Sequence, residues 1–225
     1  MIKCLLMDVD DTLLDFPWQE YHAIHRTWKA LGTPMTEEMY ARYHAVNRGY
    51  WMAYERGEID RADMLIARHA QMFEEYGLPY DAAECERIYR NNLGIGYKLI
   101  PHAIEILDWL KPRCRLFITS NGVAETQYSR LGSSGLDQYF EEIFISEEIG
   151  AVKPSKEYFA HVFSCIEGFL PEETAIVGDS LSSDILGGIN AGIQTIWFNP
   201  NQKPGRTEVR PDHEITDLLE LKNLI

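Results

Sequence analysis

The stretch that decides the fold is MIKCLLMDVDDTLLDF, residues 1–16. Residues 2–7 are mostly apolar, which predicts a buried strand. Three acids, Asp8, Asp10 and Asp11, follow this strand at once. Like charges at such short spacing repel one another, and folding alone does not require them at a strand end. We therefore expect a ligand at this position that offsets the repulsion.

Downstream of residue 97 the sequence alternates between short apolar runs and helical patterns. The expected strands in the chain cover residues 2–7, 114–119, 142–146, 174–179 and 194–199. The expected helices between and after them cover residues 102–111, a segment after Gly122, 155–167, 184–191 and 215–225. Strands that alternate with helices predict an α/β fold with a doubly wound parallel sheet, which is Rossmann-like.

The segment between the first strand and this alternating region has a helical pattern throughout. Four helices are expected there, with caps at Thr36, Asp60 and Asp81 and glycines at their ends. The sequence therefore predicts two domains: residues 1–15 with 97–225 form the α/β core, and residues 16–96 form a helical insertion.

The amino-acid composition indicates which classes of partner and which cellular compartment to expect. The formal net charge of −14 argues against binding to a nucleic-acid polymer, which needs clustered Lys and Arg, and against docking on an anionic membrane. The four cysteines form no C-x-x-C pair, which favours a reducing compartment over a disulfide framework. The first apolar run is too short for a signal peptide, so we expect a cytoplasmic protein.

Each notable polar cluster lies where an expected strand ends. Asp8 and Asp10 follow the first strand, Ser120 and Asn121 follow residues 114–119, and Asp179 ends residues 174–179. Ligands of open α/β sheets bind beyond the carboxyl ends of the strands. Taken alone, Ser120-Asn121-Gly122 would also fit a turn and a helix cap.

These clusters resemble the four motifs of the haloacid dehalogenase-like hydrolase superfamily, in the family's order and over the whole chain. Asp8-Val9-Asp10-Asp11-Thr12 resembles motif I, DxDxT, and Ser120-Asn121-Gly122 resembles motif II. Lys153-Pro154 resembles motif III, and Gly178-Asp179-Ser180 through Asp184 resembles motif IV. The resemblance implies this superfamily's core, and it implies that residues 16–96 are a class I cap that closes over the site.

The resemblance implies a phosphatase with an aspartyl-phosphate intermediate. Asp8 would be the nucleophile, and Asp10 the general acid and base, whose protonated form neighbouring carboxylates would favour. Lys153 would hold the phosphate and neutralise charge, with Ser120 and Asn121 as further phosphate or substrate ligands.

A divalent cation would offset the repulsion between the attacking carboxylate and the phosphate. Mg²⁺ prefers few carboxylates together with water and substrate oxygens. Asp8 and Asp179 are the expected side-chain ligands, and the family implies the backbone carbonyl of Asp10 as a third. Asp184 would support the metal shell or Lys153 from behind, and Thr12 would fix the turn after the strand.

Core segments narrow the subfamily. GDSLSSDILGGINAGIQTIWFNP (residues 178–200) and ISEEIGAVKPSKEYF (residues 145–159) are similar to the pyrimidine 5'-nucleotidase subfamily. The expected substrate is thus a small phosphomonoester, most specifically a nucleoside 5'-monophosphate. We expect the protein to be a monomer or a homodimer. The alternatives are a sugar-phosphate or phosphoglycolate phosphatase, a phosphomutase, and a non-catalytic phosphate-binding regulatory protein.

Overall fold

The structure is a computed structural model that describes residues 1–205 and 207–225. The chain divides into two compact units, which we call the core unit (residues 1–16 and 97–225) and the helical unit (residues 17–96). The sequence pattern grouped Phe16 with the helices, whereas in the structure this residue groups with the core unit.

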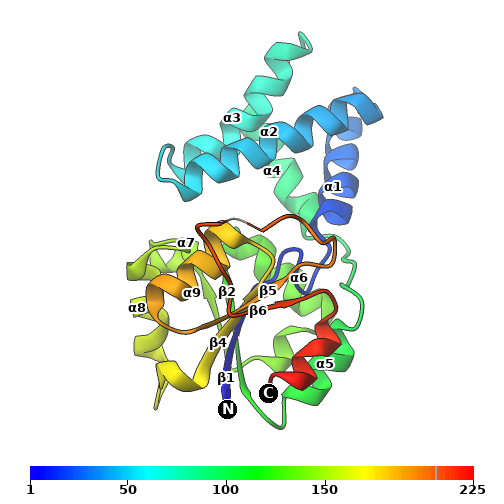
Figure 1. The fold of residues 1–225 in the computed structure, drawn as a ribbon. Coiled ribbons are helices and arrows are strands. Elements are labelled where there is room, and N and C mark those ends of the chain that lie inside the picture. The colour runs from blue at the N-terminus through cyan, green and yellow to red at the C-terminus, as the bar shows by residue number, and fades with distance from the viewer. Residues whose placement is uncertain (206) are drawn as a thin grey trace. The chain divides into compact units, whose positions relative to one another are not determined.

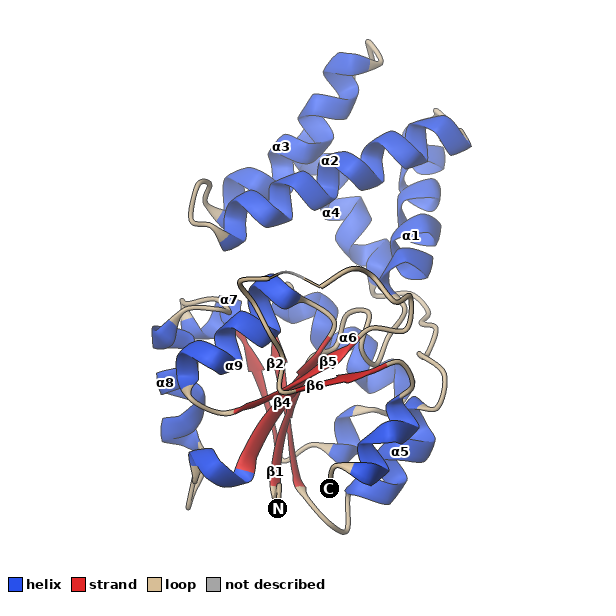
Figure 2. Cartoon of the chain, viewed as in Figure 1, coloured by secondary structure: helices blue, strands red, loops and turns tan. Residues whose placement is uncertain are grey.

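The core unit is built on one sheet of six parallel strands, ordered β3-β2-β1-β4-β5-β6. Figures 1 and 2 show this sheet with the helices of the core unit around it. The strands are β1 Cys4–Met7, β2 Arg115–Ser120, β3 Glu142–Ile145, β4 Thr174–Gly178, β5 Gln194–Phe198 and β6 His213–Ile215. The predicted α/β fold with a doubly wound parallel sheet is therefore confirmed. The first strand of the chain lies at the centre of this sheet, between β2 and β4.

Helices cover both faces of the sheet, which explains why β1 is apolar without alternation. Alternate residues of β1 face opposite sides: Leu5 packs in the cluster that includes α5, α6 and the C-terminal helical turns, and Leu6 packs in the cluster that includes α8. The helices of the core unit are α5 Ala103–Leu110, α6 Ala124–Ser134, α7 Ser146–Ile149, α8 Lys156–Cys165 and α9 Leu186–Ala191. Shorter turns are the 3₁₀ segments Asp137–Tyr139, Pro171–Glu173 and Leu218–Asn223, and a π-helical turn, Leu181–Ile185.

The helical unit contains four helices whose caps follow the sequence signals in part. They are α1 Phe16–Leu31, which begins in the core unit, α2 Glu37–Glu55, α3 Arg61–Glu75 and α4 Ala82–Leu93. The side chains of Thr36 and Asp81 accept hydrogen bonds from the first turns of α2 and α4, whereas Asp60 makes no such cap bond. Throughout the described residues, no helix has the length and apolarity needed to cross a bilayer.

The C-terminal segment differs from the prediction of one helix over residues 215–225. His213–Ile215 forms the sixth strand, at the edge of the sheet, and only Leu218–Asn223 is helical, as a 3₁₀ segment. Asp217 and Glu220 form a capping box that starts this segment. The strand escaped prediction because it is three residues long and exposes its first two side chains, so it carries no apolar run.

Candidate active site

The polar residues at the strand ends converge at one edge of the sheet. Asp8 follows β1 directly, and its backbone N–H donates to the carbonyl of Val177 in β4. Ser120 ends β2, and Asp179 follows β4. Because β2 and β4 pair with β1 in parallel register, their carboxyl ends lie on either side of Asp8.

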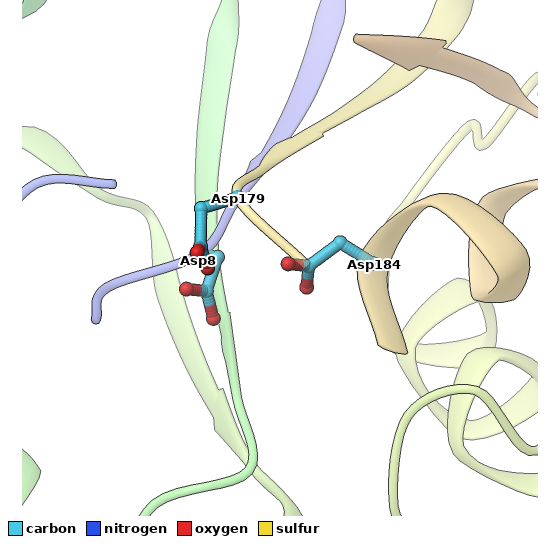
Figure 3. A group of neighbouring side chains, drawn as sticks. All are labelled: Asp8, Asp179 and Asp184. Atoms are coloured by element: carbon cyan, nitrogen blue, oxygen red, sulfur yellow. The ribbon is translucent and has the colours of Figure 1, made fainter. Parts of the chain in front are cut away.

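Three carboxylates meet at this edge. Each of Asp8, Asp179 and Asp184 offers an oxygen that lies within 4.8 Å of the others (Figure 3). They come from three separate segments: the end of β1, the end of β4 and the π-helical turn. The structure therefore brings together the two predicted metal ligands and the predicted supporting acid.

Lys153 joins two of these acids from a third loop. Its Nζ donates to Asp8 Oδ1 at 2.6 Å, to Asp184 Oδ1 at 2.7 Å and to the carbonyl of Thr119 at 2.7 Å. The side chain is 1% exposed, so these interactions are shielded from water. Three oxygen acceptors match the three N–H donors of an ammonium group, which fixes the lysine at the sheet edge.

Asn121 holds the backbone of Lys153 from both sides. Its Oδ1 accepts from the Lys153 N–H at 2.9 Å, and its Nδ2 donates to the Lys153 carbonyl at 3.0 Å. In this structure, motif II thus positions the lysine of motif III. Asn121 was predicted as a phosphate or substrate ligand, and its observed contacts are with Lys153.

Asp184 depends on a glycine at the end of β4. A Cβ atom at Gly178 would lie 2.2 Å from Asp184 Oδ2, so only glycine leaves room for this carboxylate. Both oxygens of Asp184 accept hydrogen bonds, Oδ1 from Lys153 and Oδ2 from the Ser180 N–H at 3.1 Å. The hydrogen bonds therefore fix the orientation of this carboxylate.

The turn after β1 is held by backbone hydrogen bonds. The N–H groups of Leu13 and Leu14 donate to the Val9 carbonyl, both at 2.9 Å, and Asp11 adopts the left-handed conformation with φ of 59°. Thr12 is buried, and its hydroxyl has no hydrogen-bond partner within the described part of the chain. The role predicted for Thr12 in fixing this turn has no support from its side chain and stays a prediction.

Asp10 has two hydrogen-bond partners that the sequence did not predict. Its carboxylate accepts from Arg130 Nη1 at 2.5 Å and from Gln127 Nε2 at 2.8 Å, both from α6. A cation and an amide therefore hold this acid, in addition to the repulsion between its charge and those of Asp8 and Asp11. Gln127 Nε2 also donates to Ser120 Oγ at 2.7 Å.

Sequence reasoning missed three residues around the site. Gln127 and Arg130 lie three positions apart on α6, on one face of the helix, and both are 1% exposed. The sequence shows these two polar residues three positions apart, but it does not show that they are buried or that they approach Asp10. Lys203, in the loop after β5, places Nζ 3.6 Å from Asp179 Oδ2, and nothing in the local pattern of that loop indicated it.

The electrostatics of the site show carboxylates that burial and mutual repulsion make hard to ionise. Burial, together with the charges of Asp11 and Asp184, raises the pKa of Asp179 to about 8. Burial also raises the pKa of Asp8, against the influence of Lys153. For Lys153, burial alone would lower the pKa, but the charges of Asp184 and Asp8 raise it above its ordinary value, so the ammonium stays charged.

These observations fit a magnesium ion. The donor set is made of hard carboxylate oxygens, the ligands that Mg²⁺ prefers. A divalent cation would offset the repulsion that raises the pKa of Asp8 and of Asp179. Each of the three acids offers an oxygen to such an ion, and Asp184 also accepts hydrogen bonds from Lys153 and from the Ser180 N–H.

Comparisons with known proteins agree with this geometry. Residues 2–192 match the family model described as haloacid dehalogenase-like hydrolase. The HAD-hydrolase YfnB of Bacillus subtilis is 42% identical over 99% of this chain and 95% of its own length. Its crystal structure, bound to magnesium, superimposes with a TM-score of 0.95 over 99% of this chain and 98% of that one.

Two further relatives carry the name of an activity. Pyrimidine 5'-nucleotidase PynA of Streptococcus pneumoniae is 34% identical over 99% of this chain and 97% of its own length. Pyrimidine 5'-nucleotidase YjjG of Escherichia coli is 28% identical over 98% of this chain and 96% of its own length. The similarity in each case extends over both units of the chain.

Proposed function

The chain belongs to the haloacid dehalogenase-like hydrolase family and is related to pyrimidine 5'-nucleotidases, and from this premise we propose that it is a phosphatase of nucleoside 5'-monophosphates. The observation that carries the proposal is the contact of the Lys153 ammonium group with Asp8 at the carboxyl end of β1. A phosphate that approaches Asp8 would meet this cation, which offsets the repulsion between two anions.

In the proposed first half-reaction, a carboxylate oxygen of Asp8 attacks phosphorus and forms an acyl phosphate. The bond from phosphorus to the ester oxygen breaks, and Asp10 in its protonated form gives its proton to that oxygen, so the alcohol leaves neutral. The Lys153 N–H that donates to Asp8 would turn to a phosphate oxygen, and Ser120 would donate its hydroxyl hydrogen to another.

In the second half-reaction, water attacks the same phosphorus and Asp10 takes a proton from it. The bond between Asp8 and phosphorus then breaks, which restores the Asp8 carboxylate and releases inorganic phosphate. The net reaction consumes one ester and one water and yields one alcohol and one phosphate. An acid at position 10 favours ester hydrolysis over dehalogenation, because a halide leaves without a proton.

We propose Mg²⁺ as the cofactor, held by Asp8, Asp179 and the backbone carbonyl of Asp10. When bound, Mg²⁺ supplies positive charge to the phosphate oxygens. Asp184 would keep Lys153 in place, and Asn121 would do so through the backbone. The acidic cluster supports this proposal, and so does the relative YfnB, which was crystallised with magnesium.

We propose that residues 17–96 act as a cap that selects the substrate. The YfnB structure shows interdomain movement, which is the behaviour that a cap requires. A cytoplasmic location stays part of the proposal, supported by four cysteines that are all free thiols.

The test is turnover of a panel of phosphorylated metabolites, each with added Mg²⁺ and again with a chelator. We expect UMP, dUMP and dTMP to be preferred, and the chelator to abolish hydrolysis. A clear preference for sugar phosphates or phosphoglycolate would overturn the nucleotide assignment. Retention of the phosphoryl group in the product, with a bisphosphate requirement, would indicate a phosphomutase, and no hydrolysis of any ester would indicate a regulatory protein.

A further inference from the structure

The side chains of Asp10, Gln127 and Arg130 form a closed ring of hydrogen bonds. Arg130 Nη1 donates to Asp10 Oδ1 at 2.5 Å and to Gln127 Oε1 at 2.8 Å. Gln127 Nε2 completes the ring by donating to Asp10 Oδ2 at 2.8 Å. Both oxygens of Asp10 are thereby fixed by groups on α6.

Gln127 extends this ring to the predicted phosphate ligand. Its Nε2 also donates to Ser120 Oγ at 2.7 Å, so both amide N–H groups and the amide oxygen of Gln127 are used. The Oγ of Ser120 also accepts from the Gly122 N–H at 3.1 Å. With its two lone pairs engaged, the hydroxyl has only its hydrogen left to offer, and a phosphate oxygen would accept it.

The surroundings of Gln127 hold this amide in one place. The side chains of Gln127 and Arg130 are buried, and a Cβ atom at Gly122 would lie 2.6 Å from Gln127 Nε2. Gly122 therefore leaves space that the glutamine fills. The guanidinium group of Arg130 also lies over the ring of Phe16, 5.5 Å from its centroid.

We propose that Gln127, locked by Arg130, is a positioning residue that sets the Asp10 carboxyl group and the Ser120 hydroxyl at one fixed separation. The proposal rests on the phosphatase function proposed above. The Gln127 amide orients both Asp10, which transfers the proton, and Ser120, which binds the phosphate. Both groups can therefore act on the same bound ester.

The test compares two substrates that differ in their need for a proton donor. The leaving group of a nucleoside monophosphate is an alkoxide, which needs the proton of Asp10. The leaving group of p-nitrophenyl phosphate is p-nitrophenolate, which departs without a proton. Gln127→Glu keeps the shape of the side chain and removes both N–H donors, and Gln127→Leu removes all three polar contacts. Gln138→Leu, at an exposed glutamine of the same unit, is the matched control.

We expect Gln127→Glu to lower kcat for UMP, or for the best phosphomonoester of the panel, by about 10²-fold. With p-nitrophenyl phosphate as substrate, the rate of the p-nitrophenol burst should fall by less than about 10-fold. Inhibition by inorganic phosphate should weaken about 10-fold, because Ser120 would turn its hydrogen toward the new carboxylate. Gln138→Leu should leave all three values unchanged.

A double variant separates positioning from general loss of structure. If Gln127 acts through Asp10, then Gln127→Leu should cost no more than about 3-fold in UMP turnover once Asp10→Asn is present. Three results would each overturn the proposal: an equal loss on both substrates, an unchanged kcat in Gln127→Glu, or full additivity in the double variant. None of them would contradict the phosphatase function, provided that the wild-type protein hydrolyses the substrates. A wild-type protein that hydrolyses no phosphomonoester would overturn both.

Discussion

Each unit of this protein buries a cluster of charged side chains, and the two clusters are built on opposite principles. In the helical unit, Arg68 Nη2 pairs with Glu86 Oε2 at 2.7 Å, and His69 Nε2 lies 2.9 Å from the same oxygen. Burial raises the pKa of Glu86, but Arg68 and His69 lower it below its ordinary value. At the core unit's sheet edge, by contrast, the pKa of Asp179 rises to about 8.

The difference separates a cluster that is neutralised within the folded chain from one that we propose to bind a cation. The carboxylate of Glu86 meets its cation within the protein, so ionisation and folding favour the same state. Lys153 bonds to Asp8 and Asp184, and the more exposed Lys203 lies 3.6 Å from Asp179, yet the pKa values of Asp8 and Asp179 stay raised. A cluster that stays costly to ionise within the folded chain indicates a site whose missing charge comes from outside.

The largest effect on stability should come from breaking the self-sufficient cluster. Glu86→Gln leaves the buried guanidinium of Arg68 without its carboxylate, and we expect the free energy of unfolding to fall by about 3–5 kcal/mol. Urea denaturation measures the change. Glu84→Gln, on the same helix, removes an exposed ion pair with Arg87 and should cost about 1 kcal/mol or less. Equal losses in the two variants would contradict this distinction.

Magnesium should stabilise the core cluster and leave the helical one unaffected. At a hundredfold excess over its Kd, bound Mg²⁺ should raise the free energy of unfolding by about 2.7 kcal/mol, and a chelator should reverse the gain. Thermal unfolding with and without the ion measures this. The gain should persist in Glu86→Gln and disappear in Asp179→Asn; a gain that survives in Asp179→Asn would remove that residue from the metal site.

A fall in pH should destabilise the helical unit, because His69 becomes protonated when the chain unfolds. Burial lowers the pKa of His69 to about 4, from an ordinary value of 6.5. Between these values the unfolded chain binds a proton that the folded chain refuses, so stability falls as the pH drops from 6.5 toward 4. From pH 7 to pH 5 this loss should be about 2 kcal/mol.

Hydrogen exchange of α3 amides, measured at both pH values, reports this loss within the helical unit. His69→Gln cannot titrate at this position and should flatten the dependence, whereas His161→Gln, at an exposed position of α8, should not. If the α3 amides of wild type were equally protected at pH 7 and pH 5, the assignment of His69 would be wrong.

A last change reverses the sign of the first and so sharpens the comparison. Asp179→Asn makes the same carboxylate-to-amide change as Glu86→Gln, but with a pKa of about 8 the folded site holds Asp179 mostly protonated at pH 7, whereas the unfolded chain ionises it. Asparagine removes this cost, so without metal we expect the variant to be more stable than wild type at pH 7 by at least about 1 kcal/mol. Urea denaturation in the presence of a chelator measures the change. A loss of stability would contradict the claim that Asp179 is unfavourable to the fold without a bound cation.

The sequence predicted those features of fold and site that local patterns encode. The apolar run before Asp8 and the strand-helix alternation after residue 97 predicted the parallel sheet, because burial on both faces demands such runs. The edge strand His213–Ile215 carries no such run and was missed. The 3₁₀ segment after it was predicted as an α-helix, since the apolar pattern of so few residues fits either form.

At the site, residues next to strand ends were predictable and residues brought in by helix packing were not. Asp8, Ser120 and Asp179 lie at the ends of β1, β2 and β4, where the topology itself places them together. Gln127 and Arg130 approach Asp10 only because α6 packs against the sheet, and the distance of about 120 positions along the chain hides this contact. Their roles, like those of the strand-end residues, stay proposals until tested.

The most direct measurement is a search for the covalent intermediate on Asp8. The protein is mixed with UMP and Mg²⁺, quenched in acid within one turnover, and treated with borohydride, which reduces an acyl phosphate to an alcohol. Mass spectrometry of the N-terminal peptide should then find homoserine at position 8, and Asp8→Asn should show neither this product nor turnover, with a loss of at least roughly 10⁴-fold. Rapid hydrolysis of UMP with Asp8 unmodified at every quench time, or full activity in Asp8→Asn, would contradict the account.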